Sequence, residues 1–264
     1  MARGSLKNVC RLIDVVQKEV PVEKAFLNDL ERSIEITTDK TARKPSQTYK
    51  PSSMNCIRNM YYQRTGADQD NSGSSYVLTN ICNVGTDVHE RIQKYVVGMK
   101  ENGMDCEYVD VAKFVRDRGL TDKLDIISQQ GMETKLFHKT LQMSFLCDGI
   151  IKYKNHYYIL ELKTEGSYKW TSRQGVDESH YNQGTAYSIA FDIPEVVFVY
   201  ISRDTLDMKS FLFVPTNEMK QDLIGRIENC EEYVSKLQAP PKPIDVPKKA
   251  CNYCNYKSLC RKDS

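Results

Sequence analysis

Residues 131–163 constrain the fold of this chain more than any other stretch, because they place acids within apolar strands. Residues 141–153 are rich in apolar and aromatic side chains, residues 154–156 form a short polar break, and residues 157–163 alternate with a period of two. This pattern predicts two neighbouring strands joined as a hairpin. Asp148 interrupts the first strand between apolar neighbours, where a carboxylate is costly to bury.

The second predicted strand adds two more charged side chains to the hairpin. Glu161 and Lys163 are two residues apart and therefore point to the same face, whereas Leu162 points to the opposite one. Two carboxylates and an ammonium group on one sheet face would form an oxygen-rich site for a divalent cation beside a fixed positive charge. That set suits phosphodiester hydrolysis. The same residues also fit a solvated edge hairpin with an incidental acid pair.

Length and composition indicate a globular chain with a sizeable core. The chain has 264 residues, of which 40% are hydrophobic, so one large domain with appendages is expected. Lys and Arg number 37 against 35 Asp and Glu, and this near balance gives no global argument for nucleic-acid binding. Any surface that binds nucleic acid must therefore be local.

The sequence predicts neither secretion nor a membrane span. Its first residues, MARGSLKNVCRLIDVV, contain no uninterrupted apolar segment, and no stretch approaches the length of a transmembrane helix. We therefore expect a cytoplasmic protein, of a prokaryote or encoded by its virus. In that compartment the nine cysteines are expected to be metal ligands more often than disulfides.

Hydrophobic periodicity and turn residues divide the rest of the chain into elements. Helices are predicted over residues 9–18, 22–34, 54–64, 76–100, 177–189 and 217–237, and further strands over residues 107–114, 195–202 and 208–214. Residues 37–53, which contain two prolines, and the polar residues 164–178 are predicted to be connections. The two last strands are dense in apolar residues, which predicts positions inside a sheet.

Two of the predicted helices carry paired side chains that share a face. Gly85 and His89 are four residues apart on one helix, and Gln183 and Tyr187 have the same spacing on another. A glycine lets a backbone or a ligand approach closely, and the histidine one turn later can point into the same cleft. His89 also fits an ordinary, satisfied histidine beside the charged residues that follow it.

Two further stretches near the hairpin carry polar or aromatic residues. Glu133 precedes the hairpin and could be an additional acidic ligand, but we predict a surface residue. Trp170 follows the hairpin and lies between Lys169 and Arg173. Interleaved aromatic and basic side chains suit base stacking and phosphate contact, so this connection is a candidate nucleic-acid contact.

The C-terminal cysteines form the most specific motif of the sequence. Cys251 and Cys254 form a CxxC pair, and Cys260 follows six residues later among basic residues. Three thiolates at this spacing can hold three corners of a metal or cluster site. Cys56, in the first turn of the helix predicted over residues 54–64, is the best candidate for a fourth ligand, although it also fits a core position. Both a structural zinc ion and an iron–sulfur cluster remain open on spacing alone.

Together these motifs resemble a known family. Gly85-x-x-x-His89, Asp148, Glu161-x-Lys163 and Gln183-x-x-x-Tyr187 follow one another as in RecB-type nucleases of the PD-(D/E)XK superfamily. The cysteine set resembles the iron–sulfur branch of that family, which includes the CRISPR-associated adaptation nuclease and the AddB nuclease domain. The resemblance implies an α/β fold with a restriction-endonuclease-like core, a mixed sheet flanked by helices. It suggests a helical extension over residues 1–50, the nuclease core over 51–240 and a cluster-binding tail over 241–264.

The resemblance also assigns roles to the residues that match. His89, Asp148, Glu161 and the carbonyl of Leu162 are implied to bind Mn²⁺ or Mg²⁺, and the imidazole favours Mn²⁺. Lys163 is implied to be the catalytic lysine, with Gln183 and Tyr187 positioning the lysine or DNA. A 4Fe-4S cluster is also implied, which would join the two ends of the chain over the core. Its implied ligands are Cys56, Cys251, Cys254 and Cys260.

The function expected from the resemblance is a metal-dependent deoxyribonuclease, an exonuclease that acts on single-stranded ends. A helicase, or a recombination or CRISPR adaptation complex, would be its partner. Two alternatives belong to other classes. The chain could hold DNA ends without cleaving them, which Asp148, Glu161 and Lys163 argue against, or it could be a zinc-ribbon interaction protein.

Overall fold

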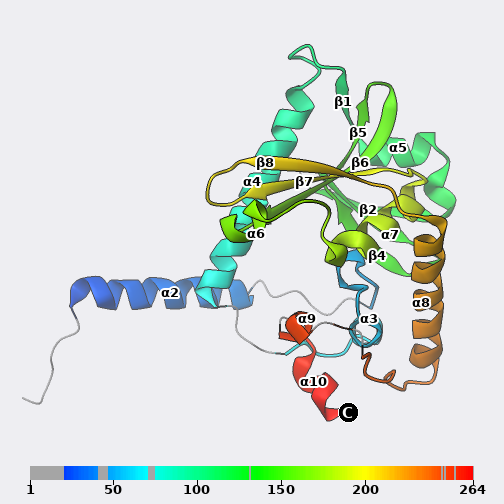
Figure 1. Ribbon diagram of the computed structural model, residues 1–264. Coiled ribbons are helices and arrows are strands. Elements are labelled where there is room, and N and C mark those ends of the chain that lie inside the picture. Colours follow the sequence, from blue (N-terminus) through cyan, green and yellow to red (C-terminus); the bar gives the residue numbers. More distant parts are fainter. Residues whose placement is uncertain are drawn as a thin grey trace, which may run out of the picture. The chain divides into compact units, whose positions relative to one another are not determined.

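The chain forms two β-sheets, and it passes from one to the other at Asp148 (Figure 1). The computed structural model describes residues 21–40, 47–70, 75–130, 132–244, 246, 248–252 and 254–263. The larger sheet has five strands in the order β1 (Cys106–Val109), β5 (Gly149–Tyr153), β6 (His156–Glu165), β7 (Val196–Ser202) and β8 (Met208–Phe213). The smaller sheet has three strands, β2 (Leu124–Gln130), β3 (Glu133–His138) and β4 (Met143–Cys147).

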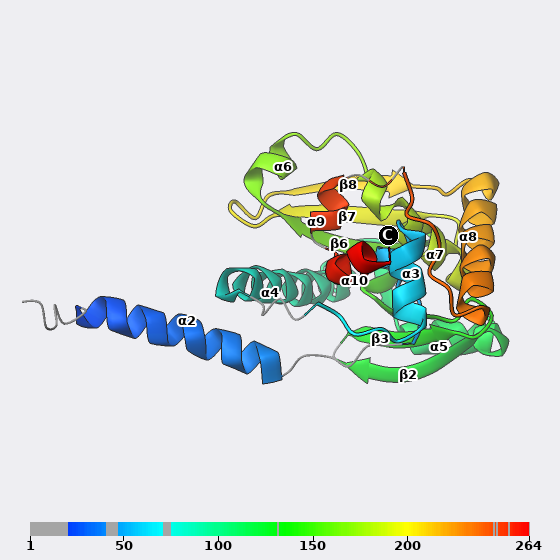
Figure 2. The ribbon, with the colours of Figure 1, turned by 90° about the horizontal axis from the view of Figure 1, so that it is seen from below.

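The larger sheet is mixed and carries helices on both faces, which confirms the predicted fold class. Strands β6 and β7 pair in parallel, and the other neighbours pair antiparallel. On one face, Val88 of α4 (Tyr76–Gly98) packs with Leu160 and Leu162 of β6. The opposite face of the sheet packs against α7 (Tyr181–Phe191). The hydrophobic core on that side also includes residues of α3 (Ile57–Arg64) and α8 (Asn217–Ser235). Figure 2 shows the helices around the sheet from below.

The prediction of one continuous strand over residues 141–153 is wrong. Cys147 ends β4 and pairs with Thr134, whereas Gly149 begins β5 and pairs with Leu160. A side chain at position 149 would force the Tyr108 ring to shift, because a Cβ atom there would lie 2.6 Å from that ring. The break therefore puts Asp148 at the junction of two sheets. The hairpin itself is confirmed, and its turn uses positive φ angles at Lys154 and Asn155.

Other predicted boundaries shift for local reasons. The strand predicted over residues 107–114 is wrong beyond Val109, because Asp110 caps α5 (Val111–Asp117) by accepting a hydrogen bond from the Lys113 amide. The helix predicted over 54–64 starts only at Ile57, with Cys56 as its N-cap residue. Strand β8 lies at the edge of the sheet and not inside it. The remaining elements are η1 (Pro51–Ser53), η2 (Leu120–Asp122), α6 (Ser167–Thr171), η3 (Glu178–His180), α9 (Lys248–Asn252) and α10 (Lys257–Lys262).

The chain divides into two compact units, Met1–Arg43 with Ser72–Cys82, and Lys44–Asn71 with Asn83–Ser264. The first unit contains α2 (Val22–Lys40), which is longer than the helix predicted over residues 22–34. In its last turns the Thr37 and Thr38 hydroxyls donate to the carbonyls of Ser33 and Ile34, one turn earlier. The helix predicted over residues 9–18 lies outside the described residues, and the predicted domain limits stay predictions. None of the helices that the structure describes is long and apolar enough to cross a bilayer.

Candidate active site and cysteine pocket

Asp148 is held in one orientation by contacts to its backbone and its carboxylate. Its Oδ2 atom accepts a hydrogen bond of 2.7 Å from the backbone amide of Leu162 on β6. Its carbonyl accepts bonds from Gln93 of α4 at 2.7 Å and from the Tyr108 hydroxyl at 3.2 Å. The side chain is buried. The carboxylate is therefore a fixed acceptor between β4 and β5 and not a mobile surface acid.

Glu161 and Lys163 lie on the face of β6 that α7 covers, as their spacing predicted. The Lys163 Nζ atom lies 2.6 Å from Glu161 Oε1 and donates to Gln183 Oε1 at 2.9 Å. The Gln183 amide in turn donates to the same Glu161 oxygen at 2.7 Å and to the Tyr187 hydroxyl at 3.0 Å. That hydroxyl donates to the Leu146 carbonyl. Gln183 and Tyr187 thus fix the lysine and its glutamate, and the buried Tyr187 contacts the protein interior.

Helix α4 brings a third element to the site. The His89 Nδ1 atom lies 3.6 Å from Asp148 Oδ1. Burial acts to lower the pKa of His89, but the hydrogen bond and charge of Asp148 outweigh it and the pKa is raised. At Gly85 the helix passes close to β6, because a Cβ atom there would lie 3.1 Å from the Thr164 hydroxyl. Sequence reasoning missed Gln93, although its position one turn beyond His89 was a signal for it.

The structure corrects the prediction for Glu133. Among the described residues, His89, Glu133 and Asp148 form a set in which one potential metal-ligating atom of each lies within 4.8 Å of the others. Glu133 is half-buried at the start of β3 and is therefore not the exposed surface residue that was predicted. Sequence patterns left a ligand role open but could not decide for it, because the approach to Asp148 depends on how distant strands pair.

The donor set fits a hard divalent cation. Glu161 is 3% exposed, and its Oε2 atom is buried without a hydrogen-bond partner in the described part of the chain. Burial, with the nearby charge of Asp148, raises the pKa of Glu161 to about 7 even though Lys163 opposes the shift. An orphaned carboxylate oxygen next to further acids is costly unless a cation neutralises it. Carboxylates with one imidazole are ligands that suit Mn²⁺.

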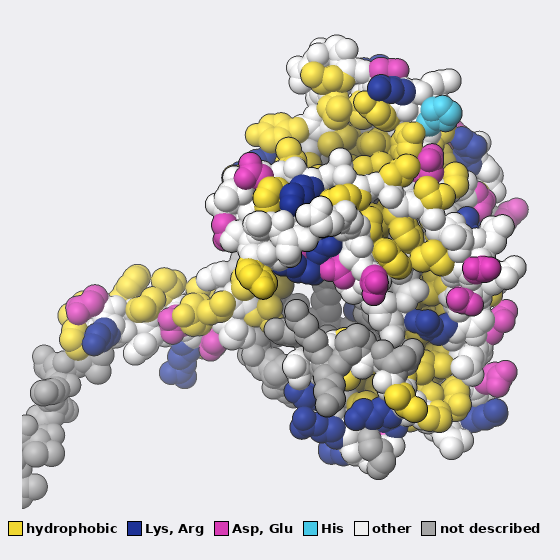
Figure 3. All heavy atoms as spheres, viewed as in Figure 1, with side chains coloured by type: hydrophobic (Ala, Val, Ile, Leu, Met, Phe, Trp, Pro, Cys, Tyr) yellow, Lys and Arg dark blue, Asp and Glu magenta, His cyan; other side chains and the backbone are white. Residues whose placement is uncertain are grey.

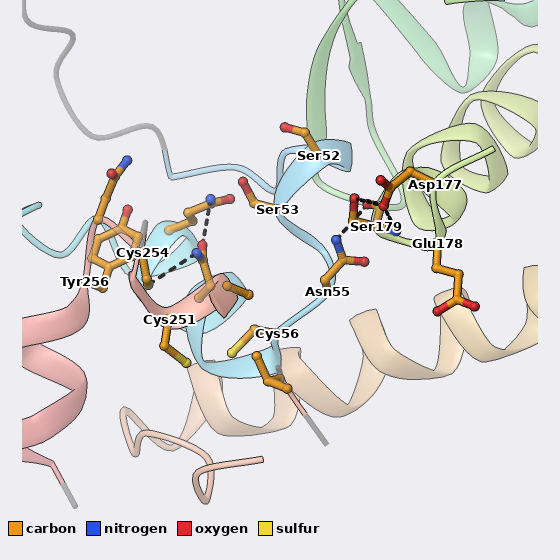
Figure 4. A pocket seen from close by; sticks show the side chains of 15 residues that line it. Ser52, Ser53, Asn55, Cys56, Asp177, Glu178, Ser179, Cys251, Cys254 and Tyr256 are labelled. Carbon is orange, nitrogen blue, oxygen red and sulfur yellow. Dashed lines mark hydrogen bonds between the residues drawn. The ribbon is translucent and has the colours of Figure 1, made fainter. Parts of the chain in front are cut away.

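The four predicted cluster cysteines line one pocket of about 400 Å³, between the N-terminal end of α3 and the C-terminal tail. Figure 4 shows three of them, Cys56, Cys251 and Cys254, around a neighbouring pocket that shares this wall. Burial raises the pKa of Cys56 and of Cys254. Among the described residues, no three of these sulfurs lie within 4.8 Å of one another. Basic side chains gather on the surface over α10 (Figure 3).

Arg58 ties the tail to α3. It is 3% exposed and donates to the carbonyls of Pro240, Cys260 and Asp263. It also donates to the Cys260 sulfur at 3.3 Å, and the Asn59 amide lies 3.7 Å from the Cys254 sulfur. Two sulfurs of the pocket therefore have N–H groups of α3 next to them.

In the connection after β6, Arg173 and Trp170 have partners within the protein, while their predicted contact with nucleic acid stays a prediction. Arg173 is buried and pairs with Glu165 through Nε at 2.5 Å and Nη2 at 2.8 Å. The Trp170 Nε1 atom donates to the Tyr200 carbonyl, and its ring lies under the Lys209 ammonium at 4.3 Å. Both side chains therefore help to hold this connection against β6 and β7. Four charged side chains pair with one another here, and we call them the Glu165 ion-pair cluster: Glu165, Lys169, Arg173 and Asp177.

Comparisons with known proteins give only distant similarity. No protein-family model matches the sequence, and no curated protein matches it. The crystal structure of SSO0001 is similar with a TM-score of 0.48 and 15% identity, over 90% of this chain and 98% of that chain. An alkaline exonuclease, LHK-Exo in complex with dAMP, is similar with a TM-score of 0.40 and 10% identity, over 72% of this chain and 91% of that chain. Another LHK-Exo structure, from Laribacter hongkongensis, has a TM-score of 0.35, 9% identity and coverage of 73% and 92%. Similarities this low do not identify a family.

Proposed function

We propose that the protein is a metal-dependent DNA nuclease that hydrolyses phosphodiester bonds from single-stranded ends. The observation that carries this proposal is the buried Oε2 atom of Glu161, which has no partner in the described residues and lies in a site with Asp148 and Lys163. A structural ion pair would satisfy both oxygens of such a carboxylate. The preference for DNA with single-stranded ends rests on the motif resemblance alone.

His89, Asp148, Glu161 and the Leu162 carbonyl would hold the Mn²⁺ or Mg²⁺ ion. The bound cation would supply an activated water and polarise the scissile phosphate. The Lys163 ammonium, fixed by Glu161 and Gln183, places a positive charge where negative charge develops on the phosphate oxygens. The Leu162 amide keeps the Asp148 carboxylate in place, and Tyr187 restricts Gln183. These residues are set before the substrate arrives, so little reorganisation is needed.

Digestion of labelled DNA tests the proposed activity. With Mn²⁺, wild-type protein should shorten a linear single strand and leave a closed circular single strand intact. Labels at the 5′ and the 3′ end of separate strands give the polarity. Lys163→Ala should lower the rate about 10²- to 10³-fold, and Asp148→Ala should abolish cleavage without altering the circular dichroism spectrum. Lys100→Ala, which removes an exposed lysine paired with Glu107, is the matched control.

Three outcomes separate the alternatives. Full activity in Asp148→Ala would remove the catalytic assignment. Strong binding of single-stranded ends without cleavage by the wild type would indicate a DNA-end-binding subunit. Cleavage of the circular strand would show an endonuclease, and the exonuclease part of the proposal would be wrong.

The cysteine pocket is proposed to hold a 4Fe-4S cluster with a structural role. Around one zinc ion, thiolates at about 2.3 Å would stand roughly 3.8 Å apart, closer than these sulfurs lie in any set of three among the described residues. A cluster of several iron and sulfide ions is wider than one zinc ion, and the pocket of about 400 Å³ provides room for it. The cluster would join Cys56 to the C-terminal tail.

Metal analysis tests this second assignment. Protein purified without oxygen should contain iron and sulfide and show broad visible absorption, and Cys254→Ala should lose that absorption and much of its solubility. Cys147→Ala, at a buried cysteine outside the pocket, should keep the spectrum. Zinc in place of iron, or an unchanged spectrum in Cys254→Ala, would contradict the assignment.

A further inference from the structure

Glu133 and Asp148 flank the last pair of the ladder between β3 and β4. Thr134 of β3 pairs with Cys147 of β4; Glu133 precedes that pair on β3, and Asp148 follows it at the junction of the two sheets. Two neighbouring carboxylates repel each other when both are charged. Here one potential ligand atom of each acid, together with one of His89, lies within 4.8 Å of the others. Such an arrangement is expected where a cation sits between the acids.

The backbone around Glu133 is fixed to the site from a third strand. The Tyr108 hydroxyl of β1 lies 2.8 Å from the Met132 carbonyl and 3.2 Å from the Asp148 carbonyl. The ring of Tyr108 packs where the missing side chain of Gly149 would be. One tyrosine therefore joins the residue before Glu133 to Asp148 itself. The backbones that carry the two acids are therefore held close together by the fold.

We propose that Glu133 is a further ligand of the divalent cation and that it acts together with His89 and Asp148. This inference rests on the proposed function of the site, because it concerns the same cation. The independent sign of a missing ligand is the buried Oε2 atom of Glu161, which shares the site with Asp148 and His89. Three carboxylates would then bind the cation beside Lys163, which lies 2.6 Å from Glu161, and a dication offsets their negative charge. The imidazole and the carboxylates together select Mn²⁺ over Mg²⁺.

The competing explanation is a structural role for Glu133 as an additional acid beside His89. The two roles predict different effects of Glu133→Gln on thermal unfolding. If Glu133 only stabilises the protonated form of His89, the midpoint of thermal unfolding falls in the metal-free variant, and Mn²⁺ raises it as much as in the wild type. If Glu133 is a ligand, the effect of the substitution appears mainly when the cation is bound. Added Mn²⁺ would then raise the midpoint less in the variant than in the wild type.

Titration with Mn²⁺, in the absence of DNA and with the free ion followed by electron paramagnetic resonance, tests the proposal. The full-length Glu133→Gln protein should bind Mn²⁺ about 10- to 100-fold more weakly than the wild type. Glu133→His should recover part of the affinity, because it restores a ligand. Glu90→Gln is the matched control, since Glu90 is next to His89 on α4 but pairs with Lys94 at the surface. It should bind like the wild type.

The outcomes distinguish this proposal from the one on which it rests. No binding of Mn²⁺ by the wild type, or equal binding by Asp148→Ala, would overturn the proposed metal site as a whole. Wild-type binding that is lost in Asp148→Ala but unchanged in Glu133→Gln would overturn only the role of Glu133. A lower unfolding midpoint of metal-free Glu133→Gln, with unchanged Mn²⁺ affinity, would assign Glu133 to the fold.

Discussion

Two buried glutamates on one face of β6 differ in how their charge is satisfied. Glu161 and Glu165 are four residues apart, and both are almost inaccessible, at 3% and 6% exposure. Both oxygens of Glu165 accept hydrogen bonds from Arg173. Only one oxygen of Glu161 is bonded, to Lys163 and Gln183, and its other oxygen has no partner among the described residues. One strand therefore carries a completed ion pair and an incomplete one.

The difference extends to the surroundings of each glutamate. In the Glu165 ion-pair cluster two acids pair with two basic side chains. Each buried charge therefore has a partner of opposite sign. Burial acts to raise the pKa of Asp177, but bonds from Lys169, Ser179 and Arg173 hold it far below its ordinary value. Around Glu161 the effect of burial outweighs the charge of Lys163, so the pKa of Glu161 is raised. A completed cluster fixes the chain, whereas an incomplete one leaves a place for a ligand.

The largest expected effect is the loss of stability in Arg173→Ala. The substitution leaves Glu165 buried with only the Lys169 ammonium, at 3.7 Å, as a charged partner, and it removes the guanidinium that stacks 4.1 Å from the Tyr200 ring centre. Breaking a buried ion pair from one side costs about 3–5 kcal/mol. Urea unfolding at neutral pH measures the change.

Replacing both members of that pair sharpens the interpretation. Glu165→Leu combined with Arg173→Met should recover most of the stability lost in Arg173→Ala, because no uncompensated charge remains. If the double variant is as unstable as Arg173→Ala, the packing of Arg173 and not its charge is responsible for the loss.

The same substitution at the two glutamates should have opposite consequences. Glu165→Gln should lower the free energy of unfolding, since it removes the charge that Arg173 needs. Glu161→Gln, measured without metal at pH 8, should stay within about 1 kcal/mol of the wild type or exceed it, because burial disfavours that charge. Its cleavage rate should nevertheless fall by about 10²-fold or more. A large loss of stability in Glu161→Gln would mean that the site is a structural ion pair.

Sequence patterns predicted the parts of this comparison that depend on local spacing. The period of two along β6 placed Glu161 and Lys163 on one face, and the four-residue spacing placed Gln183 and Tyr187 together on α7. These relations follow from strand and helix geometry alone. The structure brings the side chains together, while their roles in catalysis stay predictions.

The parts that sequence patterns missed depend on contacts between distant elements. The division of the apolar stretch at Asp148 results from pairing with two different strands, on β3 and on β6. Glu133 reaches the site only through that division. The sequence shows that Arg173 is basic and Trp170 aromatic, and this suggested a nucleic-acid contact. It does not show that they bond to Glu165 and to the Tyr200 carbonyl.

The smallest expected effect concerns acid sensitivity at His180, which lies beside both glutamate regions. Its ring stacks with the rings of Phe198 and Tyr200, and its Nδ1 atom lies 2.9 Å from the Tyr200 hydroxyl. Burial lowers the pKa of His180 to about 3, and the charge of Lys163 adds to this. The other charged groups that act on it are Asp177, Lys169 and Arg173.

A neutral His180 stabilises the fold only where the unfolded chain is also neutral. Above about pH 6.5 its contribution is fully present, and it is lost as the pH falls toward 3, because the unfolded histidine takes up a proton first. The slope from one such group is at most about 1.4 kcal/mol per pH unit. His180→Phe keeps an aromatic ring and removes the proton uptake, so urea unfolding between pH 7 and 5 should show a smaller loss of stability than in the wild type. Parallel pH profiles would mean that the native histidine is protonated, and that the region around the completed ion pairs can take up another positive charge.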